Sequence, residues 1–397
     1  MAGILHWVWL ATLPGISSRK ATRLLDELGD PLDIYSADEA RLKRVSELSA
    51  ANIEALMDKS LKRADKILHD TARLGQQVIT LADAAYPELL RAIDDPPIVL
   101  YTRGKLQTLA ARPAVAVVGP REQTQYGYRV TKHLAYQMAK AGVTIVSGMA
   151  RGTDAAAHAA ALEAGMPTIA VLGCGLDLCY PPENAALYED IPKTGVIISE
   201  YPPGTPPMAS NFPARNRIVS GMCCAVLVPE APKKSGSLIT AACAADQGRE
   251  VFAVPGNIDV ATSEGTNALI RDGAHPVLNV DDILSVLNDQ YPERIQAVPK
   301  AETLAPEDDR YVTTPVKKQR VRVAEPAPIP ASAVETAENA ALPLQTRLCA
   351  LLAASPQHAD NLIAAVPEPA GEVTAALTML ELEGRVEQQP GKIFVLV

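Results

Sequence analysis

The chain has 397 residues, a formal net charge of −9 at pH 7 and 48% hydrophobic residues. These values exclude a chain that is disordered throughout, and the length fits two or three domains that each bury a core. The acidic balance excludes a protein that coats nucleic acid through bulk charge, so any nucleic-acid site has to be a local cluster of cations. Residues 1–13 are apolar but lack a basic segment, so we expect no signal peptide, no transmembrane span and a cytoplasmic protein.

Six cysteines are spread along the chain without the spacing of a metal site. Most lie in apolar segments, where cysteine packs as a small hydrophobic residue, so we expect neither a disulfide nor bound zinc. The sequence has no P-loop fingerprint, and we expect no cofactor. The cysteines are Cys174, Cys179, Cys223, Cys224, Cys243 and Cys349.

Residues 1–75 carry short helical patterns separated by turns, which predicts a small all-helical domain. Its opening turn, residues 13–17 (LPGIS), is similar to the turn of a helix-hairpin-helix or SAM-like domain. Ser17 stands where that turn has its second glycine, so we favour a structural turn over one that binds phosphate. Residues 76–100 are expected to form an extended connector to the next domain.

Residues 101–290 alternate short apolar runs with glycine-containing turns and helical segments. Such runs are typical of strands that are buried on both faces of a parallel sheet. The pattern predicts an α/β fold with an extended Rossmann-like, doubly wound and mostly parallel sheet, whose loops meet and bind ligands at the carboxyl edge. The predicted strands are residues 114–118, 143–146, 168–172, 196–198, 225–228 and 251–254.

The last hundred or so residues differ in character from this core. Residues 291–343 are rich in proline and alanine, which predicts a flexible linker, and the basic run at 317–322 (KKQRVR) is expected to be solvated there. Residues 344–397 follow with three helical patterns and a terminal hairpin. That order predicts a winged helix.

Two turns at the carboxyl edge of the sheet combine small residues with an arginine. Gly119 and Arg121 follow the first core strand, and Ser147, Gly148 and Arg151 follow the second. Each turn precedes a helix, whose free N-terminal amides attract anions. Two neighbouring turns of this kind predict a ligand that carries phosphate.

A third segment adds an aromatic ring and further cations. The ring of Phe212 offers a flat platform for a base, and arginine offers a planar charged fork for phosphate oxygens. Single-stranded nucleic acid has both groups, so we predict that it binds here. The expected contact residues in this segment and the turn that follows are Asn211, Phe212, Arg215, Asn216, Arg217, Lys234, Ser235, Gly236 and Ser237.

Two pairs of side chains offer catalytic alternatives. Asp154 and His158 lie four residues apart on one predicted helix and can act as acid and base or as metal ligands, although a capping Asp and a hydrogen-bonded His explain them as well. Glu200 and Glu230 each close a strand at the carboxyl edge, where paired carboxylates can serve nucleotide hydrolysis. Neither has a neighbouring nucleophile in the sequence, so we predict no catalytic residue and no metal site.

Several ordered motifs between residues 80 and 285 resemble the DNA-processing protein A family (DprA/Smf). The helical domain before them and the winged helix after them also agree with that family's architecture. The motifs are residues 117–121 (VVGPR), 146–154 (VSGMARGTD) with His158, 173–177 (GCGLD) with Tyr180 and Pro181, 199–202 (SEYP), 212–217 (FPARNR), 235–240 (SGSLIT) and 249–256 (REVFAVPG).

The resemblance implies a protein without turnover chemistry that binds single-stranded DNA during natural transformation, protects it and helps to load the RecA recombinase. It implies a homodimer, with Leu269 and Ile270 in a helix near the dimer surface, and a DNA pocket lined by Arg121 and the Phe212 segment. The chain departs from the family at Pro120, where serine is usual, and at Thr153, where isoleucine is usual. Pro120 lacks an amide hydrogen, so that turn has one amide donor fewer to offer a phosphate.

Two other functions stay open from the residues alone. A Rossmann-like nucleotide hydrolase or phosphoribohydrolase can use the same sheet edge, with Glu200, Glu230 and Asp154 as catalytic groups. A transcription regulator built on the winged helix predicts duplex binding that does not need residues 100–290. We favour single-strand binding, because cations and an aromatic ring accumulate without an assembled nucleophile.

Overall fold

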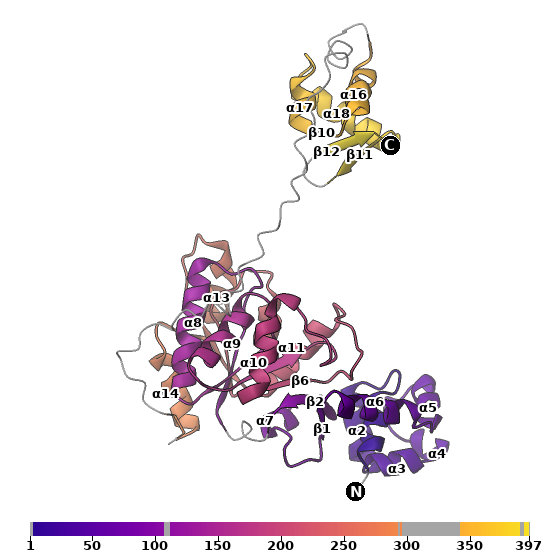
Figure 1. Ribbon diagram of the computed structural model, residues 1–397, viewed down its shortest axis with the longest axis vertical. Coiled ribbons are helices and arrows are strands. Elements are labelled where there is room, and N and C mark those ends of the chain that lie inside the picture. The colour runs from indigo at the N-terminus through magenta and orange to yellow at the C-terminus, as the bar shows by residue number, and fades with distance from the viewer. Residues whose placement is uncertain (1–2, 107–111, 293, 296–341, 390–392, 397) are drawn as a thin grey trace. The chain divides into compact units, whose positions relative to one another are not determined.

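The computed structural model describes residues 3–106, 112–292, 294–295, 342–389 and 393–396. The chain divides into two compact units, residues 1–315 and 316–397, which are described separately (Figure 1). The linker predicted at 291–343 and its basic run lie almost entirely outside the described residues. No helix in the described part of the chain is long and apolar enough to cross a membrane.

The first unit opens with the predicted helical domain. Its helices α1 and α2 enclose the turn at residues 13–17, where Gly15 has a φ of +75° and its carbonyl accepts a 2.9 Å hydrogen bond from Nδ2 of Asn52. Ser17 caps α2 by accepting a bond from the amide of Lys20. The protein's own side chains therefore hold this turn. The helices are α1 (Ile4–Ala11), α2 (Ser18–Leu28), α3 (Pro31–Ser36), α4 (Glu39–Leu42), α5 (Ala50–Met57) and α6 (Lys62–Arg73).

The rest of the first unit is built on one nine-stranded sheet in the order β1-β2-β6-β5-β4-β3-β7-β8-β9. All six predicted core strands are confirmed, and neighbouring strands from β6 to β9 run parallel. The predicted connector is not a plain spacer, because it contributes β1 and β2, which extend one sheet edge in antiparallel fashion. The strands are β1 (Gln77–Thr80), β2 (Val99–Gly104), β3 (Ala114–Val117), β4 (Thr144–Ser147), β5 (Thr168–Leu172), β6 (Val196–Ser199), β7 (Ala225–Val228), β8 (Glu250–Ala253) and β9 (His275–Pro276).

Helices cover both faces of this sheet (Figure 1). Residues of β3 and the position after it alternate between the two faces, since Val115 and Val117 pack with α8 and α14 whereas Ala116 and Val118 pack with α11 and α12. Chain order reverses at β3, which lies between β4 and β7, so the loops after these strands border the crevice where doubly wound folds bind ligands. The helices of this region are α7 (Glu88–Arg91), α8 (Gln125–Lys140), α9 (Thr153–Glu163), α10 (Ala185–Thr194), α11 (Asn211–Gly221), α12 (Gly236–Asp246), α13 (Glu264–Arg271) and α14 (Asp281–Gln290).

The second unit has the predicted winged-helix order of three helices and a terminal hairpin, with a short strand after the first helix. Its three strands pair in the order β10-β12-β11. Leu348, Leu362, Leu377 and Phe394 are among the buried residues of its own core. The elements are α16 (Leu344–Ala354), β10 (Gln357–His358), α17 (Ala359–Ala364), α18 (Ala370–Leu382), β11 (Val386–Gln389) and β12 (Ile393–Leu396).

Candidate nucleic-acid site

A pocket of about 590 Å³ opens at the carboxyl ends of β3, β4 and β7, where chain order reverses. Turns that are far apart in sequence, together with the start of α11, line it. Ten of the fourteen residues expected to bind DNA lie there: Gly119, Arg121, Gly148, Phe212, Arg215, Asn216, Lys234, Ser235, Gly236 and Ser237.

A row of three side chains lines part of the pocket. The guanidinium carbon of Arg121 lies 5.4 Å from the ring centroid of Phe212, and that ring lies 5.6 Å from the ring of Tyr180 at an interplanar angle of 32°. Arg121 is exposed. Tyr180 was missing from the expected contacts, although it belongs to the loop after β5 and therefore to the same sheet edge. The row presents two aromatic faces beside a permanent positive charge.

The N-terminus of α12 also lines the pocket. Ser235 caps the helix by accepting a bond from the amide of Ser237, and the two hydroxyl oxygens are 2.7 Å apart. Lys234 precedes them and is exposed. The N-terminus of this 11-residue helix, with the Lys234 cation beside it, favours a bound anion.

Arg215 lies at the base of the pocket rather than at its mouth, since only 5% of it is exposed. Its Nη1 donates to the carbonyl of Gly148 at 2.7 Å and also to the carbonyl of Val171. Burial lowers the pKa of this guanidinium, and the nearby Asp154 carboxylate opposes that effect. Arg215 therefore ties the ends of β4 and β5 together and gives the pocket a charged base.

Asp154 and His158 do not form an acid–base pair. Asp154 accepts bonds from the amides of Gly148 and Ala150, each at 3.1 Å, and burial raises its pKa. Nδ1 of His158 lies 2.8 Å from the Thr168 hydroxyl, which itself donates to a backbone carbonyl, so the proton is on Nδ1. Burial lowers the pKa of His158 to about 3 and keeps it neutral. The pair is structural.

Glu200 and Glu230 point into different surroundings. Glu230 is buried and accepts a 3.0 Å bond from the amide of Thr124 at the start of α8, where its carboxylate packs against Gly127. Glu200 pairs with Arg217. The two carboxylates that a nucleotide hydrolase would need are therefore engaged separately, and the described residues contain no group of three or more potential metal ligands.

Four of the fourteen expected contact residues lie outside the pocket lining. Ser147 is buried and its hydroxyl donates to the carbonyl of Val117, while Arg151 pairs with Glu183 at 3.1 Å. Asn211 donates to the carbonyl of Gly173 at 3.0 Å. Arg217 borders a second cavity beside the helical domain. The sequence predicted the sheet edge at which these residues lie but not the direction in which each side chain points.

Comparison with known proteins gives the same assignment for both units. The family described as DNA recombination-mediator protein A matches residues 77–288, and a second family, the DprA winged helix domain, matches residues 327–392. The N-terminal helical domain lies before the first of these matches.

Individual relatives agree with the family matches. Protein Smf of Synechocystis is 39% identical over 334 residues, which cover 82% of this chain and 81% of that protein. The crystal structure of DNA processing protein A from Streptococcus pneumoniae aligns with a TM-score of 0.64 at 34% identity, over 72% of this chain and 98% of that one. A solved Helicobacter pylori DNA processing protein A, described for its single-stranded DNA binding mode, aligns with a TM-score of 0.50 at 35% identity, over 54% of this chain and 97% of that one. The chain therefore belongs to the DNA-processing protein A (DprA/Smf) family of DNA recombination mediators.

Proposed function

We propose that the protein binds single-stranded DNA in the pocket at the carboxyl edge of the sheet. The observation that carries the proposal is the row formed by Arg121, Phe212 and Tyr180, in which the Phe212 ring lies 5.4 Å from the Arg121 guanidinium carbon and 5.6 Å from the Tyr180 ring. A single strand has exposed base faces for such rings, whereas the bases of a duplex are already stacked. The single-strand binding mode described for the Helicobacter pylori relative supports the same reading.

Different residues of the pocket would bind different parts of the DNA strand. Phe212 and Tyr180 would stack on bases, and Arg121 and Lys234 would neutralise phosphates together with the N-terminus of α12. The Pro120 turn has one amide donor fewer for this purpose. Arg215 would contribute its charge from the base of the pocket.

We further propose the role that the family resemblance implied, which is binding and protection of incoming single strands in natural transformation and assistance in loading the RecA recombinase in the cytoplasm. In this role the protein carries out no turnover. The separate engagement of Glu200 and Glu230 supports a binding function over hydrolysis.

A homodimer built on the surface around α13 completes the proposal. Leu269 and Ile270 of α13 are both only partly buried. The segments on either side of this helix expose Ile258 to 95% and Leu278 to 80%. If these side chains form one continuous apolar surface, that surface suits contact with a second copy of the chain. Ile258→Glu and Leu278→Glu are expected to shift the sedimentation coefficient to that of a monomer, and a variant that stays dimeric would contradict this surface.

The stacking row is tested most simply at Phe212. Phe212→Ala is expected to weaken binding of an oligo-dT by roughly 1–3 kcal/mol, the usual loss of one stacked base. Phe212→Trp keeps a platform and should retain most of the affinity. Fluorescence anisotropy measures both. Unchanged affinity in Phe212→Ala would remove this pocket from the DNA path, and nucleotide hydrolysis assays would then become the relevant experiment.

A further inference from the structure

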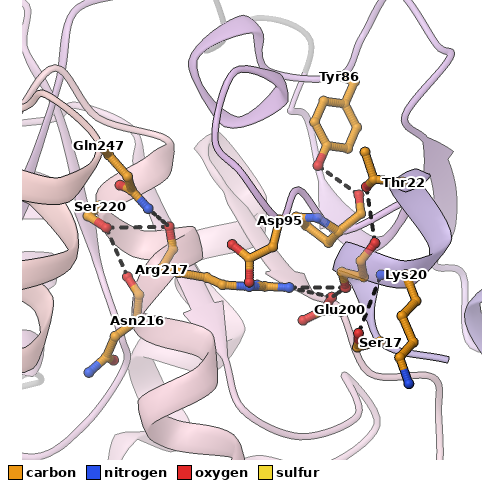
Figure 2. Close-up of polar contacts among 12 residues, drawn as sticks. Ser17, Lys20, Thr22, Tyr86, Asp95, Glu200, Asn216, Arg217, Ser220 and Gln247 are labelled. Carbon is orange, nitrogen blue, oxygen red and sulfur yellow. Dashed lines mark hydrogen bonds and ion pairs between the residues drawn. The ribbon is translucent and has the colours of Figure 1, made fainter. Parts of the chain in front are cut away.

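Arg217 belongs to the same FPARNR motif as Phe212 and Arg215, but its side chain is engaged elsewhere (Figure 2). Its Nε lies 2.8 Å from Oδ2 of Asp95, and its Nη2 lies 2.7 Å from Oε1 of Glu200 and 3.2 Å from the hydroxyl of Ser18. Ser18 in turn donates to Glu200 at 2.5 Å. One guanidinium therefore holds two carboxylates and a hydroxyl in a single network.

The partners of Arg217 come from different parts of the first unit. Ser18 is the first residue of α2 in the N-terminal helical domain, Asp95 lies in the loop before β2, and Glu200 directly follows β6. The backbone carbonyl of Arg217 also accepts a 3.0 Å bond from Gln247, just after α12. The network thus joins the helical domain, the antiparallel sheet edge and α11.

This environment is unsuited to a phosphate. Two carboxylates surround one guanidinium, so the cluster formed by Arg217, Asp95 and Glu200 carries a net negative charge. The Arg217 side chain is 14% exposed, and its Nη1 is buried. The donors of Arg217 are thus occupied or covered, in contrast to the exposed guanidinium of Arg121.

The geometry of α11 connects the two sites. Residues two apart on a helix point in nearly opposite directions, so Arg215 and Arg217 project from different faces. One face of α11 supplies Phe212 and Arg215 to the DNA pocket, and the other supplies Arg217 to a cavity of about 860 Å³ that is lined from both the helical domain and the core. A change in how the helical domain docks would therefore reach the pocket through α11.

We propose that Arg217 is a positioning residue that fastens the N-terminal helical domain to α11 and so fixes the DNA pocket, without contacting DNA. This inference rests on the proposed single-strand binding. It predicts that the Arg217 network affects affinity but leaves unchanged the number of phosphates that the protein neutralises.

The first test compares salt dependence of oligo-dT binding by fluorescence anisotropy. Each lost phosphate contact lowers the slope of log K against log salt by about 0.7 for a single strand. Arg121→Gln should show that loss. Arg217→Gln should weaken binding by about three- to tenfold with an unchanged slope. A slope that falls in Arg217→Gln as it does in Arg121→Gln would overturn the proposal.

Two further variants distinguish a positioning role of Arg217 from a purely electrostatic one. The first tests whether DNA affinity rises or falls, and the second tests whether a lysine restores it. Glu200→Ala removes a negative charge from the Arg217 network. A purely electrostatic role predicts tighter binding to DNA, whereas loss of the network predicts weaker binding. Arg217→Lys keeps the charge but cannot span both carboxylates, so it should stay as weak as Arg217→Gln. Tighter binding by Glu200→Ala, or wild-type binding by Arg217→Lys, would each contradict the positioning role.

Hydrogen–deuterium exchange in the absence of DNA tests the Arg217 network independently of the proposed DNA binding. Ser18→Ala removes one hydroxyl from the network and is the mildest variant, so folding should survive. Hydrogen–deuterium exchange should become faster in α11 (residues 211–221) of Ser18→Ala while it stays unchanged in α8. Unchanged exchange in α11 would overturn the coupling. A wild-type protein that fails to bind oligo-dT would instead overturn the proposed function and leave the exchange result standing.

Discussion

At the scale of single residues, the base of the pocket depends on a glycine at position 148, where there is no room for a side chain. A Cβ atom on Gly148 would lie 2.4 Å from Nη2 of Arg215, and that guanidinium donates to the carbonyls of Gly148 and Val171, so it can shift only by losing these bonds. The glycine is needed here for close approach, since its φ is not in the left-handed region. Arg215 and Gly148 therefore act as one packed unit.

Gly148→Ala is expected to destabilise the protein by roughly 1–3 kcal/mol, because overpacking has to displace Arg215. It should also weaken oligo-dT binding, since the base of the pocket moves. Thermal unfolding and anisotropy measure the two effects. Gly236→Ala is the matched control for stability, because a Cβ there meets nothing within 4 Å. Equal melting temperatures for the two variants would contradict this account.

His158 gives the protein a pH-dependent stability. Its folded pKa of about 3 is below the ordinary value of 6.5, because burial and then Arg215 disfavour the charged ring. Between these two values the unfolded chain binds more protons than the folded one, so the free energy of unfolding falls as pH falls, by up to about 1.4 kcal/mol per pH unit. Asp154, whose pKa is raised by burial, contributes with the opposite sign.

The contribution of His158 is isolated by a difference between two proteins. Denaturant unfolding of the wild type and of His158→Gln is measured from pH 8 to pH 4.5. The stability difference between them should be constant above pH 7 and should shrink on acidification below about pH 6.5. A difference that stays constant through this range would show that His158 is not held neutral.

At the scale of elements, helices α8 and α9 are joined by a buried ion pair. Nζ of Lys132 lies 3.0 Å from the carboxylate of Glu163, and both side chains are more than 90% buried. Removing one partner leaves the other charge buried, so Glu163→Ala is expected to cost roughly 3–5 kcal/mol of stability in denaturant unfolding.

The double variant Lys132→Met with Glu163→Leu is the control for that pair. It replaces both charges by apolar groups, and it should recover most of the loss, because neither ion is left buried. A double variant that is as unstable as Glu163→Ala would show that packing volume, rather than the uncompensated charge, decides the loss.

Helix α11 shows what the sequence does and does not predict about a single element. The FPARNR motif predicted that its residues lie at the ligand edge, and Phe212, Arg215 and Asn216 do line the pocket. The two arginines look alike in the sequence, and their roles separate only when the helix rotation is known. That rotation depends on long-range packing of α11 against α12 and β5, and it brings Arg217 to Ser18, 199 positions away in the sequence.

At the scale of the whole molecule, the periodicity of the apolar runs predicted the parallel core, because strands buried on both faces have a distinctive composition. Glycine turns at the strand ends likewise predicted that the pocket lies at the carboxyl edge of the sheet. The antiparallel edge was not predicted, since β1 and β2 lie in a segment whose prolines resemble those of a connector. Tyr180 was missed because its ring contact with Phe212 depends on the spatial order of the strands, in which β5 neighbours β4.

The charge of the molecule bears on how it selects its ligand. The chain is acidic overall, and the charged residues of α18, the third helix of the winged helix, are Glu372 and Glu381. Duplex binding through that helix would lack the cations that neutralise phosphates. The proposed selectivity for single strands therefore depends on the pocket of the Rossmann-like core.

The most direct measurement is fluorescence anisotropy of a labelled oligo-dT and a matched duplex, with the wild type and Arg121→Glu, across a salt series. We expect tight single-strand binding that weakens as salt rises, much weaker duplex binding, and loss of single-strand binding in Arg121→Glu. Equal affinity for the duplex, or normal binding by Arg121→Glu, would contradict the central claim that this pocket binds single-stranded DNA.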